Sequence, residues 1–128
     1  MRQTQSVKSR AAKLERWRRF GQEVRSRRLE KGLGLRELAG KVGISPPYLS
    51  KVEHGEFPPP AEKRIVAIAD HIGVSADVLL ALAGKVAKDI RVIITKHPEA
   101  WTAFLRSARG LGEEEIRQLA RKVGQDVR

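Results

Sequence analysis

Five of the seven glycines between residues 30 and 85 each follow a segment in which apolar residues recur every three or four positions. These glycines are Gly32, Gly43, Gly55, Gly73 and Gly84. Such spacing is typical of amphipathic helices, and glycine is the usual residue just past a helix end. No β-hairpin signal and no internal repeat occurs. The pattern therefore predicts an all-α fold.

The expected helices run from about Ala11 to Lys31, and then over residues 35–42, 46–54, 61–72 and 76–83. Ser45 and Ser75 stand where a side chain can cap the helix that follows, and Pro46 occupies a first helical position. Beyond Gly84, further helices are expected over residues 86–96, from Pro98 and from Glu113. The run Ile93–Thr95 is also compatible with a strand.

Positive charge is concentrated at the N-terminus. The net charge is +11 in 128 residues, and residues 1–28 hold ten Lys or Arg against two Glu. Residues 1–9 show no apolar period and are expected to form a flexible arm. An excess of this size indicates a polyanionic partner, nucleic acid or an anionic membrane face. We divide the chain into a basic arm (1–16), a central domain (17–84) and a C-terminal helical segment (85–128).

Several functional classes lack support in the sequence. Cysteine is absent, which excludes disulfides and thiol catalysis and fits a reducing cytosol. The three histidines are far apart and lack acidic companions at ligand spacing, so no metal is expected. No nucleophile motif, phosphate loop or dinucleotide fingerprint occurs. No apolar run is long enough to cross a membrane. We expect a non-enzyme without a cofactor, in the cytoplasm.

Residues 35–55 carry the most specific pattern. Two short helices meet at a tight turn, where Gly43 can adopt the left-handed conformation and Ala39 is small enough for close helix approach. Apolar residues then face the rest of the core, at Leu38, Val42, Ile44, Leu49 and Val52. This combination indicates a helix-turn-helix.

Residues 20–83 resemble the Cro/lambda-repressor type of helix-turn-helix domain, the XRE family of bacterial and phage regulators. The resemblance rests on Phe20-Gly21, Arg28, Lys31–Leu33, Arg36–Ala39, Gly43–Gly55 and Ile72–Val74. It implies a five-helix domain that binds operator DNA as a homodimer, with helix 45–54 in the major groove. It further implies a transcriptional regulator that associates with the nucleoid. A repressor is expected in preference to an activator.

The resemblance also implies which residues contact DNA. Lys51 can reach a guanine or a phosphate, whereas Pro46 and Pro47 offer only apolar contact, for instance to a thymine methyl. Because the two prolines cannot donate hydrogen bonds to bases, we expect a larger share of sequence recognition through DNA shape. Tyr48 is expected either at a phosphate or as a packing ring. The expected DNA-contacting set is Arg36, Ser45, Pro46, Pro47, Tyr48, Ser50, Lys51 and His54. Members of the family often have Gln at the position of Leu35, and the side chain of that Gln contacts a phosphate. Leu35 cannot make this contact, and Arg36 is the candidate to replace it.

Arg28 and Glu53 resemble a structural ion pair that ties the first helix to the end of the recognition helix; the alternative places Arg28 on DNA. The arm is read either as a phosphate or minor-groove contact or as a solvated extension of the first helix. Its candidate contacts are Arg10, Lys13, Arg16, Arg18 and Arg19. Trp17 and Phe20 are expected in the core, with base stacking as the alternative.

The C-terminal segment has apolar stripes that need a partner surface. We expect a homodimer interface formed by Ile90, Ile94, Trp101, Phe104, Leu105, Leu111, Ile116 and Leu119. The resemblance leaves open an antitoxin, whose C-terminal segment binds a toxin, and a repressor inactivated by a metallopeptidase. A third alternative is an adaptor that binds nucleic acid or protein without sequence specificity, which the two prolines in helix 45–54 would favour.

Overall fold

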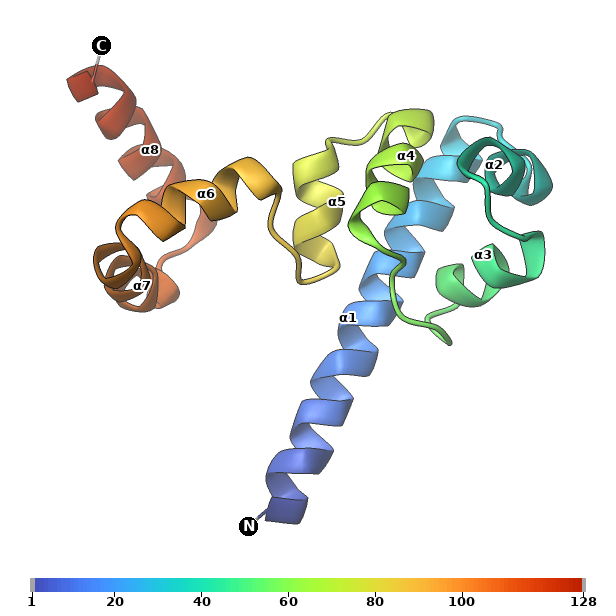
Figure 1. The fold of residues 1–128 in the computed structure, drawn as a ribbon, viewed down its shortest axis with the longest axis horizontal. Helices are drawn as coiled ribbons and strands as arrows, with labels where there is room; N and C mark the ends of the chain where they lie inside the picture. The colour runs from blue at the N-terminus through green and yellow to red at the C-terminus, as the bar shows by residue number, and fades with distance from the viewer. Residues whose placement is uncertain (1, 128) are drawn as a thin grey trace. The chain divides into compact units, whose positions relative to one another are not determined.

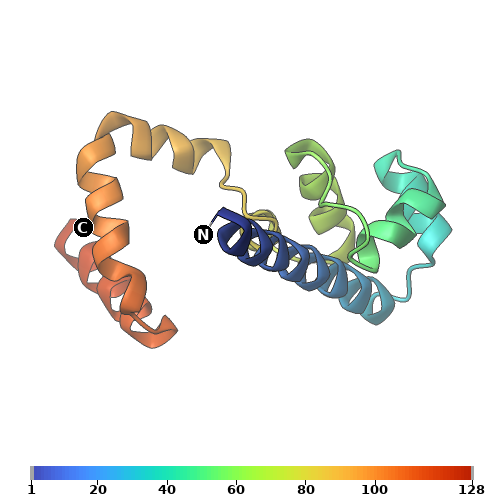
Figure 2. The ribbon, with the colours of Figure 1, turned by 90° about the horizontal axis from the view of Figure 1, so that it is seen from below.

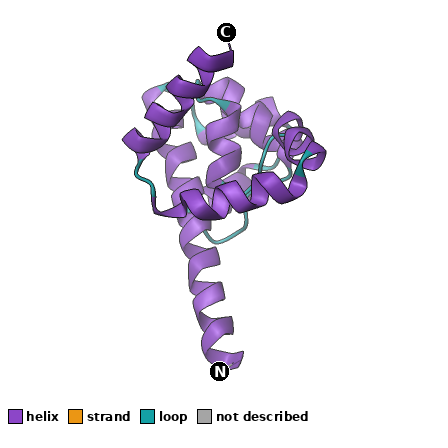
Figure 3. Ribbon diagram, turned by 90° about the vertical axis from the view of Figure 1, so that its left-hand side faces the viewer, coloured by secondary structure: helices purple, strands orange, loops and turns teal. Residues whose placement is uncertain are grey.

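The computed structural model describes the backbone of residues 2–127 and the side chains of residues 7–125. Every regular element in this part of the chain is helical (Figure 3), which confirms the all-α prediction. In chain order the elements are α1 (Arg2–Glu30), α2 (Leu35–Val42), α3 (Pro46–Glu53), α4 (Glu62–Ile72), α5 (Ala76–Leu82), α6 (Lys88–Lys96), α7 (Pro98–Ser107), the 3-10 turn η1 (Ala108–Gly110) and α8 (Glu113–Val127) (Figure 1).

The chain forms two compact units, the first ending at Ala87 and the second beginning at Lys88. The first unit contains α1 to α5, the five helices that the resemblance implied. The five punctuating glycines all have φ between 70° and 75°, the left-handed conformation that ends a helix. Helix ends in this unit were predictable because glycine adopts this conformation without the steric cost that a Cβ would add.

The core of the first unit lies where α2, α3, α4 and α5 pack around the C-terminal half of α1. From α1 it takes Phe20 and Val24, both fully buried, whereas Trp17 is only half-buried. Two further apolar residues of α1, Leu14 and Leu29, are 36% and 56% exposed. The other buried apolar residues are Leu38, Ala39, Val42, Leu49, Val52, Ile65, Ile68, Ala69, Ile72, Leu79, Leu80 and Ala83.

The start of α1 differs from the sequence prediction. Residues 2–9 were expected to be a flexible arm, but they belong to one continuous helix that reaches Glu30 (Figure 2); Met1 lies outside the described residues. The segment gave no apolar period because nothing covers it: every described side chain from Val7 to Arg16 is exposed. Its Lys, Arg, Ala and Leu residues are nevertheless good helix formers.

The second unit consists of α6, α7, η1 and α8. The strand alternative for Ile93–Thr95 is wrong, since these residues lie within α6. No described residue from 88 to 125 is buried. Trp101 and Phe104 meet edge to face, with ring centroids 6.0 Å apart, but large apolar side chains on all three helices stay at least one-third exposed. This unit therefore presents apolar surface without a core of its own.

Candidate nucleic-acid interface

The turn between α2 and α3 is held by backbone and side-chain contacts. Gly43 takes the left-handed conformation with φ 75° and ψ 36°, and the Ile44 amide donates to the Ala39 carbonyl at 3.0 Å. Arg64, from α4, donates to the carbonyl of Val42 and so satisfies an acceptor at the end of α2. These contacts fix the direction in which α3 leaves the turn.

Helix α3 starts as the sequence indicated. Ser45 is its N-cap, and the Ser45 hydroxyl accepts a hydrogen bond from the Tyr48 amide at 3.2 Å. Pro46 and Pro47 occupy the first two helical positions, where their missing N–H groups cost nothing. Ser75 differs: it is the N-cap residue of α5, but its side chain makes no capping hydrogen bond.

The C-terminal end of α3 is clamped against α1. Arg28 donates from Nε to Glu53 Oε2 at 2.7 Å and from Nη2 to Oε1 at 2.9 Å. A third donation runs from Nη1 to the Leu33 carbonyl at 2.9 Å, so each guanidinium nitrogen makes a hydrogen bond within the protein. The side chains of Arg28 and Glu53 are only 8% and 2% exposed, respectively. The hydrogen bonding of Arg28 to the Glu53 carboxylate is the main cause that raises the pKa of Arg28, against the opposing effect of burial.

Gly21 allows this clamp to form. A Cβ at residue 21 would lie 2.2 Å from the Val52 carbonyl oxygen and 2.6 Å from that of Glu53. Only a residue without a side chain fits, because both neighbours are backbone atoms that cannot swing away. Arg28 is therefore engaged inside the protein, and the alternative that places it on DNA is not favoured.

The opposite side of α3 faces solvent. Pro47, Lys51 and His54 are exposed, and three further residues of the predicted contact set are half-buried: Pro46, Tyr48 and Ser50. Ser45 is also exposed, as is Arg36 in the first turn of α2. The structure thus brings the predicted residues from Ser45 to His54 onto one short helix and its two caps.

Phe57 was missed at the sequence level. It follows α3, is 39% exposed, and its ring centroid lies 6.0 Å from that of Tyr48. The Lys51 ammonium sits 5.0 Å from the same ring centroid, within the range of a cation–π interaction. The sequence shows only a Phe before three prolines, so nothing in a helical period could link it to Lys51. Phe57 therefore contacts two residues of the predicted DNA-contacting set, Tyr48 and Lys51.

His54 has a defined hydrogen-bonding role. Its Nδ1 lies 2.7 Å from the carbonyl oxygen of Ser50, and a carbonyl can only accept. The proton therefore sits on Nδ1, and neutral His54 presents an acceptor at Nε2. Only the protonated imidazolium has a second N–H to offer to a phosphate.

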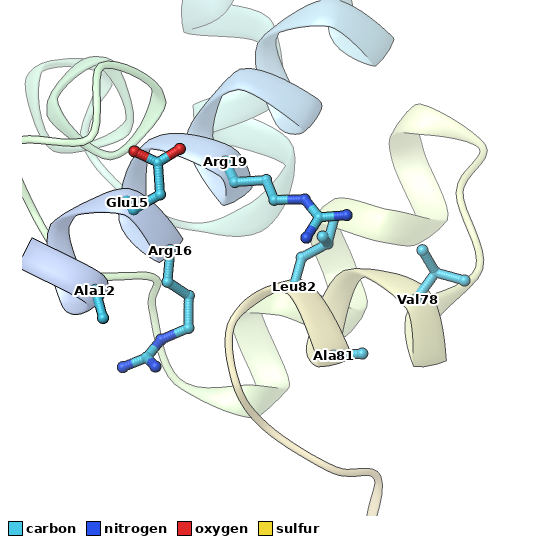
Figure 4. A pocket seen from close by; sticks show the side chains of 7 residues that line it. All are labelled: Ala12, Glu15, Arg16, Arg19, Val78, Ala81 and Leu82. Carbon is cyan, nitrogen blue, oxygen red and sulfur yellow. The ribbon is translucent and has the colours of Figure 1, made fainter. Parts of the chain in front are cut away.

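The predicted basic residues lie on α1, and all are exposed: Arg10, Lys13, Arg16, Arg18 and Arg19. Arg16 and Arg19 also border an open groove whose other wall is α5 (Figure 4). Ala12 and Glu15 complete the α1 side, and the α5 side is apolar, formed by Val78, Ala81 and Leu82.

The residues predicted to form a dimer interface lie on α6, α7 and α8 and in the turn before α8. Five of them are exposed, namely Ile90, Phe104, Leu105, Ile116 and Leu119, and three are half-buried, namely Ile94, Trp101 and Leu111. Among the residues that the structure describes, no three His, Asp or Glu side chains gather as metal ligands would. Within the same residues, no helix has the length and apolar character needed to span a bilayer.

Comparison with known proteins gives consistent matches. A family model for a helix-turn-helix domain matches residues 19–82. Two relatives from Mycobacterium tuberculosis strains, both named uncharacterized HTH-type transcriptional regulators, are 42% identical over 64 residues. That match spans 50% of this chain and 45% of each relative, so the chain spans less than half of their length.

Two solved structures are also similar. The clp gene regulator ClgR from Corynebacterium glutamicum is 25% identical, with a TM-score of 0.48 over 75% of this chain and 96% of that chain. The SinR protein/SinI protein complex gives 25% identity and a TM-score of 0.48 over 85% and 99%. The family model alone covers half of the chain and contains the whole α2–turn–α3 geometry. The chain therefore belongs to the helix-turn-helix domain family, of the Cro/lambda-repressor type that residues 20–83 resemble.

Proposed function

We propose that the protein is a sequence-specific DNA-binding transcriptional regulator, a dimeric repressor that inserts α3 into the major groove. The observation that carries this proposal is the division of α3 into two sides. One side is fixed to the core by Leu49, Val52 and the Arg28–Glu53 pair. The other presents Pro47, Lys51 and His54 to solvent. The names of the Mycobacterium tuberculosis relatives, HTH-type transcriptional regulators, support the same function.

Lys51 is the residue most suited to direct readout. Its ammonium is exposed at the end of α3, and the Phe57 ring limits where it can move. A lysine can bond guanine O6 and N7 or a phosphate. Pro46 and Pro47 cannot donate, so the first turn of α3 contributes shape and contact with thymine methyl groups. We infer few direct base contacts and a large share of readout through DNA shape.

Fluorescence anisotropy tests this function. Binding to the DNA upstream of the protein's own gene is compared with binding to a shuffled duplex at two salt concentrations. A repressor of its own gene should prefer the upstream duplex by about 10³-fold or more. Equal affinity for both duplexes at each salt concentration would overturn the proposal and favour the adaptor alternative.

Lys51→Ala is the matching variant. Loss of one base-contacting lysine should cost about 1–3 kcal/mol of binding free energy on the upstream duplex. Lys96→Ala, which removes an exposed lysine of α6 instead, is the control and should leave the preference unchanged. Equal effects of the two variants would exclude α3 as the reading helix.

The apolar surface of the second unit supports dimerisation with another copy. A stable interface buries about 800 Å² on each partner, and in a two-fold dimer the same patch serves both chains. Phe104 and Leu105 are each about half exposed on α7. Leu105→Glu is therefore expected to shift the full-length protein from dimer to monomer in sedimentation. Val66→Glu, at an exposed apolar position of α4, should not.

A monomeric full-length protein would overturn the homodimer. The apolar faces of α6, α7 and α8 would then need a different protein partner, as in the toxin-binding and peptidase-controlled alternatives.

A further inference from the structure

The N-terminal half of α1 is a basic helix that extends beyond the packed part of the domain. We call residues 7–19 the basic segment. Phe20 is the first fully buried residue of α1, and in the basic segment only Trp17 is even half-buried. The segment holds one acidic residue, Glu15, against six basic residues: Lys8, Arg10, Lys13, Arg16, Arg18 and Arg19.

Electrostatics within the basic segment oppose its helical form. Ahead of the segment, the first turn of α1 also has no acidic residue to complement the positive end of the helix dipole. Like charges recur at i and i+3, as in Arg10–Lys13 and Lys13–Arg16, and such pairs are mutually destabilising. An exposed helix of this length is marginal on its own. A polyanion along the segment would screen all of these repulsions at once.

The C-terminal end of the basic segment lies beside the end of α3. Gly21 packs against the carbonyls of Val52 and Glu53, and a Cβ on Gly55 would lie 2.9 Å from Arg18 Cα. The basic segment therefore leaves the domain at the C-terminal end of the helix proposed to enter the major groove.

Its helical form restricts how it can meet DNA. A helix with side chains is about 10–12 Å across, whereas the minor groove is about 6 Å wide. The minor-groove contact considered for a flexible arm therefore does not fit. The basic side chains also spread around the helix at 100° per residue instead of forming one edge, and Ser9 is the only hydroxyl or amide side chain among them. This arrangement suits phosphates better than base edges.

We propose that the basic segment binds the phosphate backbone of duplex DNA next to the site read by α3, and that this contact stabilises the segment as a helix. The proposal rests on the proposed function for its choice of duplex DNA as partner. At 1.5 Å per residue the segment is about 20 Å long, which matches about six phosphates along one strand. It would add affinity and extend the protected DNA without adding sequence preference.

The salt dependence of binding to a shuffled duplex of about three helical turns tests the proposal. The test variant is Lys8→Gln/Arg10→Gln/Lys13→Gln, since glutamine keeps helix propensity. With two of these three side chains on phosphate, the salt slope should fall by about 2, and the affinity lost between 50 and 200 mM salt should shrink by about tenfold.

The matched control removes the same charge elsewhere. Lys88→Gln/Lys96→Gln/Lys122→Gln neutralises three exposed lysines of the second unit and should leave the salt slope unchanged. Equal slopes for the two triple variants would overturn the proposal, because net charge and not the basic segment would then drive binding. Binding to vesicles of phosphatidylserine and phosphatidylcholine is measured with the same variants. If the segment variant lost more affinity for these vesicles than for the duplex, the proposal would also be overturned.

Hydrogen exchange gives a second readout. Amides of residues 8–16 should exchange quickly in the free protein, because their side chains are exposed, and more slowly with saturating shuffled duplex. Unchanged exchange would contradict the proposal. The two proposals fail separately: loss of preference for the upstream duplex removes the regulator function, whereas an unaltered salt slope in the segment variant removes only the phosphate contact.

Discussion

At the scale of single residues, a few contacts between α1 and α3 hold α3 against the rest of the first unit. Arg28 on α1 and Glu53 on α3 lie 25 residues apart in sequence and form two hydrogen bonds in a buried position. Gly21 lets the two backbones approach closely enough for that pair to form. These residues hold α3 without contributing to its exposed side.

Glu53→Ala should therefore act on stability. It leaves the Arg28 guanidinium buried without its carboxylate, which costs about 3–5 kcal/mol. Urea unfolding of the variant should show a correspondingly lower free energy of unfolding. Glu23→Ala is the control: its pair with Arg27 is exposed, so the loss should stay below about 1 kcal/mol. An unchanged melting temperature for Glu53→Ala would contradict the structural role.

Gly21→Ala should also destabilise the protein, because the added methyl group overlaps two backbone carbonyl groups. Overpacking of this kind costs about 1–3 kcal/mol or more. Gly40→Ala provides the comparison, since a Cβ at residue 40 of α2 meets nothing within 4 Å. The control should gain up to about 1 kcal/mol from better helix propensity. Thermal unfolding of both variants decides the matter, and a stabilised Gly21→Ala would show that the helices can separate.

At the scale of elements, helix ends depend on local caps. The Ser45 hydroxyl bonds the Tyr48 amide, whereas Ser75 occupies the same position before α5 without such a bond. Ser45→Ala should cost about 1 kcal/mol, and Ser75→Ala should cost clearly less. Comparison of the melting temperatures of the two variants tests this difference. Equal decreases in melting temperature would mean that the Ser45–Tyr48 hydrogen bond adds no stability beyond that of a serine at the N-cap.

Elements with a local cause were predictable from the sequence. The ends of α2 and α4 follow from Gly43 and Gly73, and the start of α3 follows from Ser45 and Pro46. The start of α1 was not predictable, because an uncovered helix needs no apolar period and leaves none in the sequence. The contact of Phe57 with Lys51 depends on how the chain turns after α3, which no helical spacing encodes.

At the scale of the whole molecule, the two units differ in how they bury apolar residues. The first unit contains every buried apolar residue of the described chain, and the second contains none. The sequence predicted apolar stripes in both, but a stripe does not reveal whether it packs within the chain or against a partner.

A fragment of residues 1–87 should accordingly fold by itself. Because it keeps the complete core, its urea unfolding should remain cooperative, with a free energy of unfolding close to that of the corresponding transition in the full chain. In sedimentation it should be monomeric, since α6 to α8 are missing. A fragment that dimerises as the full chain does would place the interface in the first unit.

The clamp at the C-terminal end of α3 has a consequence for how such proteins diversify. The residues that secure this helix, Gly21, Arg28 and Glu53, are not the residues that it presents to solvent, such as Pro47 and Lys51. Mutations on the exposed side can therefore accumulate with little loss of folding free energy. A duplicated copy of this domain could drift to a new binding site one substitution at a time and stay folded at every step.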